Sequence, residues 1–370
     1  MTAPRLEIDL GKLRHNARTL VERLQAHGIA VTGVTKAILG SPEIATVLLE
    51  AGVSGLGDSR IENLEKMRRL RVPGPMTLIR SPMLSQVDRV VRSADTSFNT
   101  EPAVISALSA AAVRARRAHG VVLMVELGDL REGIMSADLV GVARQLLGLR
   151  NIELRGIGTN LACQSGVEPG AQNMADLSAL TRSIEAACGR PLATVSGGNS
   201  ANLRWALGSA AKGRVNDLRL GESILLGCDP LDRSPIEGLY TDAILLAAEV
   251  IELKVKPSQP WGGIAQTAFG DRPRAADRGP ISRAILAIGI QDADPDGLTP
   301  PPGTEIIGAS SDHLILDAGE TSIRVGSEVA FQLNYGALVR AMTSLFVARF
   351  LRQEDAGRQF RREISLPIAS

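Results

Sequence analysis

The chain has 370 residues and carries 41 Lys and Arg residues against 40 Asp and Glu residues, so its formal net charge is +1. A protein that binds nucleic acids or membrane surfaces needs a basic excess to engage phosphates, and this balance argues against both classes. Hydrophobic residues make up 44% and charged residues 22% of the sequence, which excludes a disordered chain. At about 150 residues per domain, the length predicts two or three domains, or one large barrel with a smaller module.

Cysteine usage and the lack of targeting patterns bear on location. The 3 cysteines are too few and too dispersed for a disulfide framework or a zinc site, which fits a reducing compartment. The sequence has no uninterrupted apolar run of about 18 residues that would predict a membrane span. Residues 1–7 lack the apolar core of a signal peptide. We therefore expect a cytoplasmic protein.

Short apolar runs alternate with longer helical patterns between about residues 29 and 227. Strands are expected at residues 29–34, 53–56, 76–79, 96–98, 121–125, 154–158, 193–195 and 217–220. Strong helix formers lie between them, as at residues 42–51 and 102–117. The alternation implies parallel pairing, because parallel neighbours need a crossover long enough to hold a helix. Eight strands over roughly 200 residues match a (β/α)8 TIM barrel.

The pattern changes after about Ser234. Apolar runs at residues 243–253 and 313–317 are broken by Pro- and Gly-rich loops, which predicts a mostly antiparallel β domain. The stretch at residues 294–303 has the composition of a surface loop. We expect a barrel domain at residues 1–234 and a β domain at residues 235–370, with the first ten or so residues as candidates for either domain.

Lys36 follows the apolar end of the first predicted strand. In a TIM barrel this position lies at the carboxyl face, where active sites occur. A desolvated amine there suits Schiff-base chemistry, because burial disfavours the charged form. The alternative is a strand-end lysine whose ammonium group reaches solvent.

Two glycine-bearing loops follow the last two predicted strands. The first, Ser196–Ser200, has small residues that let the backbone approach an anion, and the second is Arg219–Glu222. TIM barrels often bind a phosphate between the loops after strands seven and eight. Each loop alone is equally compatible with an ordinary turn. Together with Lys36, they point to a phosphate-bearing aldehyde cofactor.

Two other motifs fail as sites. Residues 292–297 imitate the start of an EF-hand, but Gly303 stands where the loop needs a glutamate, so no metal site is predicted. No Gly-x-Ser-x-Gly elbow is paired with a suitable histidine. Of the 4 histidines, only His313 is kept as a candidate, and a strand histidine bonded to backbone is its alternative.

A set of short segments follows one order along most of the chain. They are Glu7–Leu10, Val34–Ala37, Thr159–Cys163, Asn199–Ser200, Arg219–Gly221, Ala309–His313 and Asn334–Gly336. Together they resemble the alanine racemase family of fold-type III pyridoxal-phosphate enzymes, and most closely its ornithine-racemase-like branch. That family has a barrel followed by a β domain, in agreement with the change of pattern near Ser234.

The resemblance implies that pyridoxal 5'-phosphate is bound covalently through Lys36. The other cofactor contacts that it implies are Arg131, Asn199, Ser200, the backbone at Gly221, Arg219 and Tyr335. Ser200, Gly221 and Tyr335 would hold the phosphate, and Arg219 matches the arginine that faces the pyridine nitrogen. A permanent guanidinium there keeps the nitrogen unprotonated and the ring a weaker electron sink. Arg131 matches an arginine near the phenolic oxygen.

Racemisation needs acid–base groups on both faces of the α-carbon, and Lys36 is expected to serve one of them. Alanine racemases use a tyrosine from the partner subunit on the other face, and this chain has Phe269 where that tyrosine would fall. Our candidates for the missing group are Asp312 and His313, with Cys163 behind them. Asn160 replaces the family's histidine after strand six, which is a second departure.

The favoured interpretation is an amino-acid racemase, working through a cofactor-stabilised α-carbanion, whose substrate is ornithine or another larger amino acid. The alternative is a non-catalytic pyridoxal-phosphate carrier, whose members share segments such as Gly57–Asn63 but generally lack a β domain. A metal-assisted D-amino-acid aldolase or dehydratase is disfavoured, because no cysteine follows His313. The resemblance also implies a homodimer in which the β domain completes the partner's site.

Overall fold

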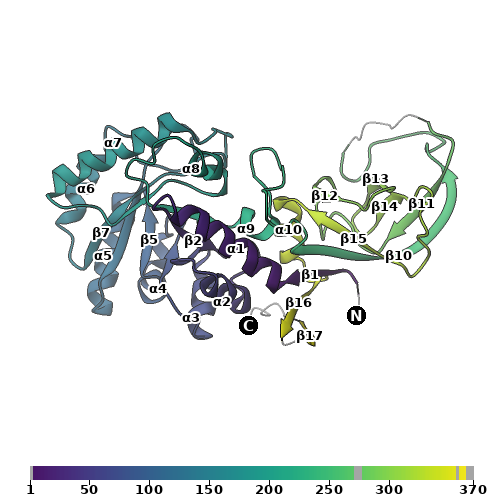
Figure 1. Cartoon of the computed structure of the whole chain (residues 1–370), viewed down its shortest axis with the longest axis horizontal. Helices are drawn as coiled ribbons and strands as arrows, with labels where there is room; N and C mark the ends of the chain where they lie inside the picture. The colour runs from purple at the N-terminus through teal and green to yellow at the C-terminus, as the bar shows by residue number, and fades with distance from the viewer. Residues whose placement is uncertain (1–2, 271–276, 356–357, 364–370) are drawn as a thin grey trace. The chain divides into compact units, whose positions relative to one another are not determined.

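The computed structural model describes residues 3–270, 277–355 and 358–363. The chain divides into two compact units (Figure 1). One unit is Lys12–Tyr240, and the other joins Met1–Gly11 to Thr241–Ser370. Within the described ranges, no helix is long and apolar enough to cross a bilayer.

The first unit is a closed barrel of parallel strands, which confirms the predicted fold class. Its strands are β2 (Ala30–Val34), β3 (Gly55–Asp58), β4 (Met76–Leu78), β5 (Thr96–Asn99), β6 (His119–Met124), β7 (Ile152–Gly158), β8 (Thr194–Ser196) and β9 (Asp217–Leu220). The ring closes where β9 pairs with β2, with Thr32 opposite Arg219. Parallel strands all point one way, so their carboxyl ends meet at one face of the barrel.

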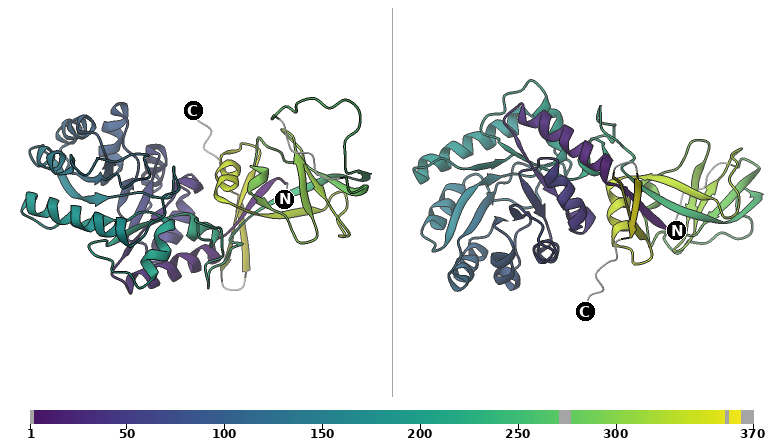
Figure 2. Two further views of the ribbon diagram at one scale, coloured as in Figure 1. Left: turned by 90° about the horizontal axis from the view of Figure 1, so that it is seen from above. Right: turned by 60° about the horizontal axis from the view of Figure 1, so that its bottom comes forward.

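Helices surround the barrel strands (Figure 2). They are α1 (Leu10–Gln25), α2 (Pro42–Glu50), α3 (Ile61–Arg69), α4 (Val87–Ser93), α5 (Pro102–Ala115), α6 (Leu139–Leu147), α7 (Ala171–Cys188), α8 (Leu203–Leu207) and α9 (Glu222–Leu226). Two residues stabilise the start of α2: Pro42 occupies its first turn, and the Ser41 Oγ accepts the Ile44 amide. The helices bury an apolar face, which leaves residues such as Leu56 and Leu64 without exposed surface.

Over its described residues, the second unit is a mostly antiparallel sheet with one α-helix. Its elements are β1 (Arg5–Asp9), β10 (Ile244–Pro257), β11 (Pro280–Leu286), β12 (Leu298–Thr299), β13 (Glu305–Ala309), β14 (Leu314–Asp317), β15 (Glu328–Leu333), α10 (Tyr335–Thr343), β16 (Ala348–Asp355) and β17 (Arg358–Glu363). β1 lies between β10, which it meets antiparallel, and β16, which it meets parallel. The leading strand of the chain is thus part of this sheet.

The expected surface loop at residues 294–303 is partly wrong. Its first half forms a 3-10 turn, Pro295–Gly297, followed by the short strand β12, which pairs with β15. Leu298 is 8% exposed, and a Cβ at Gly297 would lie 2.3 Å from the Asn334 Oδ1. Composition does not carry the pairing of β12 or the packing of the turn against the start of α10, because both are tertiary effects.

The burial of β1 gives a test of its place in the sheet. Ile8 has no exposed surface, so Ile8→Ala should destabilise this unit by about 2–5 kcal/mol, through lost apolar burial and a cavity. Urea unfolding followed by circular dichroism measures the shift. Ile251→Ala, at a residue that is 46% exposed in β10, is the matched control and should change the midpoint little. Equal shifts would contradict the placement of β1.

Candidate active site

Lys36 lies just beyond β2, separated from it by Thr35, at the carboxyl end of the barrel strands. It opens the 3-10 turn Lys36–Ile38 and is partly buried. Backbone from the next strand holds this turn, because the Thr35 amide donates to the Gly57 carbonyl at 2.9 Å. The amine is therefore carried by a segment that is tied to β3.

The side chain of Asp58, at the end of β3, also holds this turn. Its carboxylate accepts the Thr35 hydroxyl at 2.7 Å, the Arg60 amide at 2.8 Å and the Asn63 side-chain amide at 3.0 Å. Burial raises the pKa of Asp58, and these hydrogen bonds and the charge of Lys36 oppose the rise. In the sequence, Asp58 drew notice only as part of the Gly57–Asn63 segment that carrier proteins share. A carboxylate directly after a short strand, with Asn63 near it, was the available signal.

The loops after β8 and β9 meet at a pair of serines. The Ser200 Oγ accepts the Ser223 amide at 3.2 Å and lies 3.0 Å from the Ser223 Oγ. Both residues are buried. Asn199 supports the first loop, because its side-chain oxygen accepts the Ala201 amide at 2.8 Å and its Nδ2 donates to the Leu161 carbonyl at 2.8 Å. The structure thus brings together the two loops that the sequence predicted as a phosphate site.

A second carboxylate lies beside these loops. Burial raises the pKa of Glu222, and the charges of Arg233 and Lys36 oppose the rise. Glu222 pairs with Arg233, which lies further along the same connection. Because Lys36 influences Glu222, the ends of β2 and β9 share one electrostatic environment. In the sequence, Glu222 is only the last residue of the Arg219–Glu222 loop, and nothing there signals its contact with Arg233.

Arg219 is buried in the barrel, and both terminal nitrogens of its guanidinium donate hydrogen bonds. Its Nη1 donates to the Ser196 hydroxyl at 2.6 Å, and its Nη2 donates to the Thr159 carbonyl at 2.8 Å. Its guanidinium carbon lies 5.1 Å from the centre of the Phe98 ring. Burial lowers the pKa of Arg219 to about 10, with Asp217 opposing the effect. The guanidinium is therefore still charged at neutral pH.

Asn160 has an unused donor beside Arg219. Its Oδ1 accepts the Arg219 Nη2 at 3.2 Å and the Asn199 Nδ2 at 3.1 Å. Its Nδ2 is buried, with no hydrogen-bond partner in the part of the chain that the structure describes. A buried amide donor is costly to leave unpaired, so this atom marks a place where a bound group can contribute an acceptor.

Arg131 lies at the same face in the loop after β6, where it contacts Cys163 of the loop after β7. Its Nη1 is 2.8 Å from the Cys163 Sγ, and it also pairs with Glu132. Asp129, in the loop after β6, holds the loop after β7 by accepting its backbone amides, among them that of Gln164 at 2.9 Å. Burial raises the pKa of Asp129, but these backbone hydrogen bonds outweigh it, and the pKa lies below its usual value.

The remaining predicted residues belong to the unit that contains the sheet. Tyr335 begins α10, and Phe269 is 51% exposed in the loop between β10 and β11. Asp312 accepts the Ser311 hydroxyl at 2.7 Å and also bonds Gln291, whereas the His313 Nδ1 lies 3.4 Å from the Ser310 hydroxyl. Both are exposed. Over the described ranges, no group of three or more His, Cys, Asp and Glu side chains could hold a metal ion.

Comparison with known proteins agrees with this arrangement. Residues 8–230 match the family model for the alanine racemase N-terminal domain. The chain belongs to the alanine racemase family. The predicted resemblance is thus confirmed. The matched region contains the barrel, with Lys36 after its first strand and the buried Arg219 on its last strand.

Two relatives align over nearly their whole length. The chain is 39% identical to an ornithine racemase of Acetoanaerobium sticklandii, over 94% of this chain and 99% of the relative. It is 37% identical to a lysine racemase of Thermotoga maritima, over 94% of this chain and 98% of the relative. Among solved structures, alanine racemase of Clostridium difficile 630 has a TM-score of 0.74 at 18% identity, covering 99% of both chains. The last likeness shows the fold alone.

The loop held by Asp129 gives a testable pH dependence. Because its pKa is depressed in the folded chain, Asp129 stabilises the loop above about pH 4, and this contribution is lost as the pH falls through the folded pKa. Asp129→Asn should therefore lower the hydrogen-exchange protection of residues 163–167 by about tenfold or more at neutral pH. The difference from the unmodified chain should vanish in acid.

Hydrogen-exchange mass spectrometry over several pH values makes this measurement. Asp176→Asn is the control, since this carboxylate lies on α7 and accepts an exposed hydrogen bond from the Gln172 side chain at 3.0 Å. A protection difference that is the same at every pH would show that the charge of Asp129 plays no part.

Proposed function

We propose that the chain is a pyridoxal 5'-phosphate-dependent racemase of a basic amino acid, of the ornithine or lysine class. One observation carries the proposal: Lys36 lies at the same barrel face as Arg219 and the Ser200–Ser223 pair, in a chain that aligns end to end with an ornithine and a lysine racemase. Both relatives act on larger amino acids than alanine by their names, which agrees with the departures at Phe269 and Asn160.

The residues present fit this cofactor. Paired buried hydroxyls at Ser200 and Ser223 suit a phosphate, together with the backbone at Gly221 and the Tyr335 side chain that the family places there. Arg219 is a permanent donor for the ring nitrogen, and the unpaired Asn160 Nδ2 offers a further donor beside it. Lys36 would attach the aldehyde, while Arg131 would approach the phenolic oxygen and Asn199 would hold the loop.

The chemistry divides between the cofactor and the chain. When bound, the cofactor withdraws electrons from the α-carbon of an attached amino acid and so acidifies the α-proton. Lys36 removes this proton on one face and returns it on the same face in the reverse direction. Arg219, still charged at neutral pH, keeps the ring nitrogen from taking a proton, which limits side reactions. Asp58 fixes the turn from which Lys36 acts.

The second face needs a group other than a tyrosine at position 269. Asp312 and His313 are exposed and titratable, and they remain our first candidates. Cys163 is the reserve candidate, because it is exposed and contacts Arg131 at the barrel face that carries Lys36.

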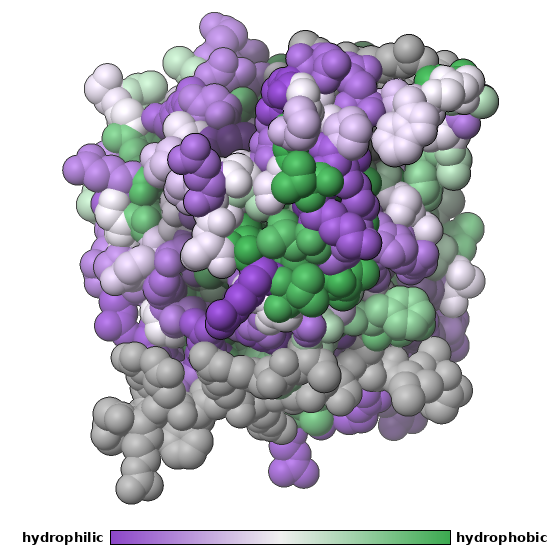
Figure 3. Space-filling model, turned by 90° about the vertical axis from the view of Figure 1, so that its right-hand side faces the viewer, coloured by the Kyte–Doolittle hydropathy of each residue, from purple (hydrophilic) through white to green (hydrophobic). Residues whose placement is uncertain are grey.

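A homodimer is part of the proposal, because the family's second group comes from a partner subunit. The unit Met1–Gly11 with Thr241–Ser370 exposes large apolar side chains, including Trp261 at 82% and Phe346 at 70%. Figure 3 shows apolar residues gathered on one face among hydrophilic ones. Exposed apolar groupings of this kind mark interaction surfaces, which supports a partner chain.

Exchange of the α-proton in deuterated water tests the function directly. Each enantiomer of ornithine, lysine, alanine and other amino acids is incubated with the holoenzyme, and deuterium is followed by mass spectrometry. We expect exchange and inversion for ornithine or lysine, and much slower exchange for alanine. Exchange with no amino acid, by a protein that retains the cofactor, would instead indicate a carrier.

Lys36→Ala is the control for this panel. The change should reduce exchange by about a thousandfold or more, because it removes both the attachment amine and a proton-transfer group. Borohydride treatment of the unmodified protein should leave the reduced cofactor on the peptide that contains Lys36. Lys254→Ala, at an exposed lysine of β10, should retain both properties. A cofactor trapped elsewhere would refute the assignment.

Substitutions at the three candidates identify the second acid–base group. Asp312→Asn, His313→Asn and Cys163→Ser are compared in the same exchange assay. Loss of the true group should lower racemisation by about 10²–10⁴-fold while one enantiomer still exchanges its proton through Lys36. If all three variants racemise normally, the second group is elsewhere in the chain.

A further inference from the structure

A chain of hydrogen bonds crosses the barrel interior from Thr32 to Arg219. The Thr32 hydroxyl donates to one carboxylate oxygen of Asp217 at 2.7 Å, and the Ser196 hydroxyl donates to the other. The Arg219 Nη1 donates to the same Ser196 oxygen at 2.6 Å. A guanidinium can only donate, so Ser196 must direct its proton at Asp217. The direction of every bond between Arg219 and Asp217 is therefore fixed.

Strand register builds this chain into the barrel wall. Asp217 and Arg219 are two residues apart on β9, so their side chains lie on one face of the strand. Ser196 on β8 pairs with Asp217, and Thr32 on β2 pairs with Arg219. Three adjacent strands thus supply the four side chains, and none of them lies on a loop.

Two of the four groups are buried charges of opposite sign. Asp217 is 8% exposed and Arg219 is 5% exposed, and Ser196 between them has no exposed surface. Burial raises the pKa of Asp217 and lowers the pKa of Arg219, and each charge opposes the shift of the other. A buried charge without compensation is strongly unfavourable, so each group depends on the other.

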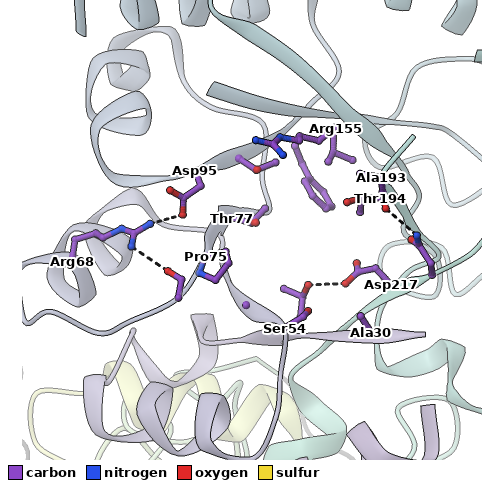
Figure 4. A pocket seen from close by; sticks show the side chains of 17 residues that line it. Ala30, Ser54, Arg68, Pro75, Thr77, Asp95, Arg155, Ala193, Thr194 and Asp217 are labelled. Carbon is purple, nitrogen blue, oxygen red and sulfur yellow. Dashed lines mark hydrogen bonds and ion pairs between the residues drawn. The ribbon is translucent and has the colours of Figure 1, made fainter. Parts of the chain in front are cut away.

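Asp217 also reaches a second region of the barrel. It forms part of the wall of a cavity of about 690 Å³, lined by Thr32, Asp95 and Arg68 among others (Figure 4). Ala30, the first residue of β2, lines this cavity, whereas Lys36 lies beyond the carboxyl end of β2. The cavity therefore lies at the amino ends of the strands, opposite to the candidate active site.

We propose that Asp217 is a positioning residue for the cofactor, which acts through Ser196 to hold the Arg219 guanidinium charged and oriented. The proposal rests on the proposed function, in which Arg219 faces the ring nitrogen. Asp217 touches neither substrate nor cofactor, because Ser196 lies between it and Arg219. Asp217 supplies the negative charge that balances Arg219. Ser196, which donates to Asp217 and accepts from the Arg219 Nη1, orients the guanidinium.

A merely structural Asp217 would behave differently from a positioning one. Loss of a buried hydrogen bond lowers stability wherever it occurs, so a lower unfolding temperature alone carries no information about Arg219. A positioning role also changes how the cofactor is held, and this change must disappear when Arg219 itself is altered.

The experiment measures cofactor binding by apoprotein variants. Unmodified protein, Asp217→Asn, Ser196→Ala and Thr32→Val are titrated with pyridoxal 5'-phosphate, by fluorescence for affinity and by absorption for the spectrum of the bound form. We expect Asp217→Asn and Ser196→Ala each to weaken binding about tenfold and to shift the absorption band, as expected for loss of a charge-assisted bond. Thr32→Val, one step further from Arg219, should have a smaller effect.

Double variants and a control separate the outcomes. Asp217→Asn should have no further effect on affinity or spectrum in an Arg219→Lys background. Asp95→Asn, at the cavity carboxylate that pairs with Arg68, should leave both unchanged. The proposal would be overturned if folded Asp217→Asn and Ser196→Ala proteins bound the cofactor with unaltered affinity. It would also be overturned if Asp217→Asn lowered the affinity equally in the Arg219 and the Arg219→Lys backgrounds. If Asp217→Asn does not fold, Ser196→Ala decides alone. Failure of the unmodified protein to bind the cofactor would instead refute the proposed function.

Discussion

Pairing of β2 with β9 is the constraint on which the candidate site depends. Lys36 follows one strand and Gly221 follows the other, and the register Gly33 opposite Leu220 brings them to one edge. Parallel direction then decides which end of the barrel they share. The neighbouring strands complete the site, since β3 holds the Lys36 turn, β8 contributes Ser196, and the turn after β8 contributes Ser200.

Buried charge is the second organising feature. Arg219, Asp217 and Asp58 are all carried inside the barrel unit, where an isolated charge would be strongly unfavourable. Neighbouring segments supply hydrogen bonds to each charge. Ser196 and Thr32 donate to Asp217, Ser196 accepts from Arg219, and the Thr35 hydroxyl donates to Asp58. Such networks are rigid because loosening one bond leaves another group unpaired. A cofactor ring bound against them would meet groups that are already oriented.

The sequence predicted those features that depend on local pattern. Apolar runs gave the barrel strands, and β9 was placed at its observed limits, residues 217–220. Strand order alone predicts that Lys36 and the loops of Ser200 and Arg219 lie at one barrel face, and the structure has them there, while their roles stay predictions. The Thr35–Asp58 bond, the Ser196–Asp217 link and the packed turn at Gly297 were missed. Each joins residues that are distant in sequence, and hydropathy carries no signal for a partner chosen by the fold. The roles of Asp312 and His313 stay predictions for the same reason.

The position of β1 has a consequence for synthesis on the ribosome. Arg5 lies opposite both Ala247 and Ala348, so this strand emerges long before its second neighbour, β16, has been made. At about 5–20 residues per second, the wait lasts on the order of tens of seconds. Leu6 and Ile8, which have no exposed surface in the finished sheet, are accessible to chaperones throughout that interval. The barrel strands, whose partners lie closer in sequence, can assemble first.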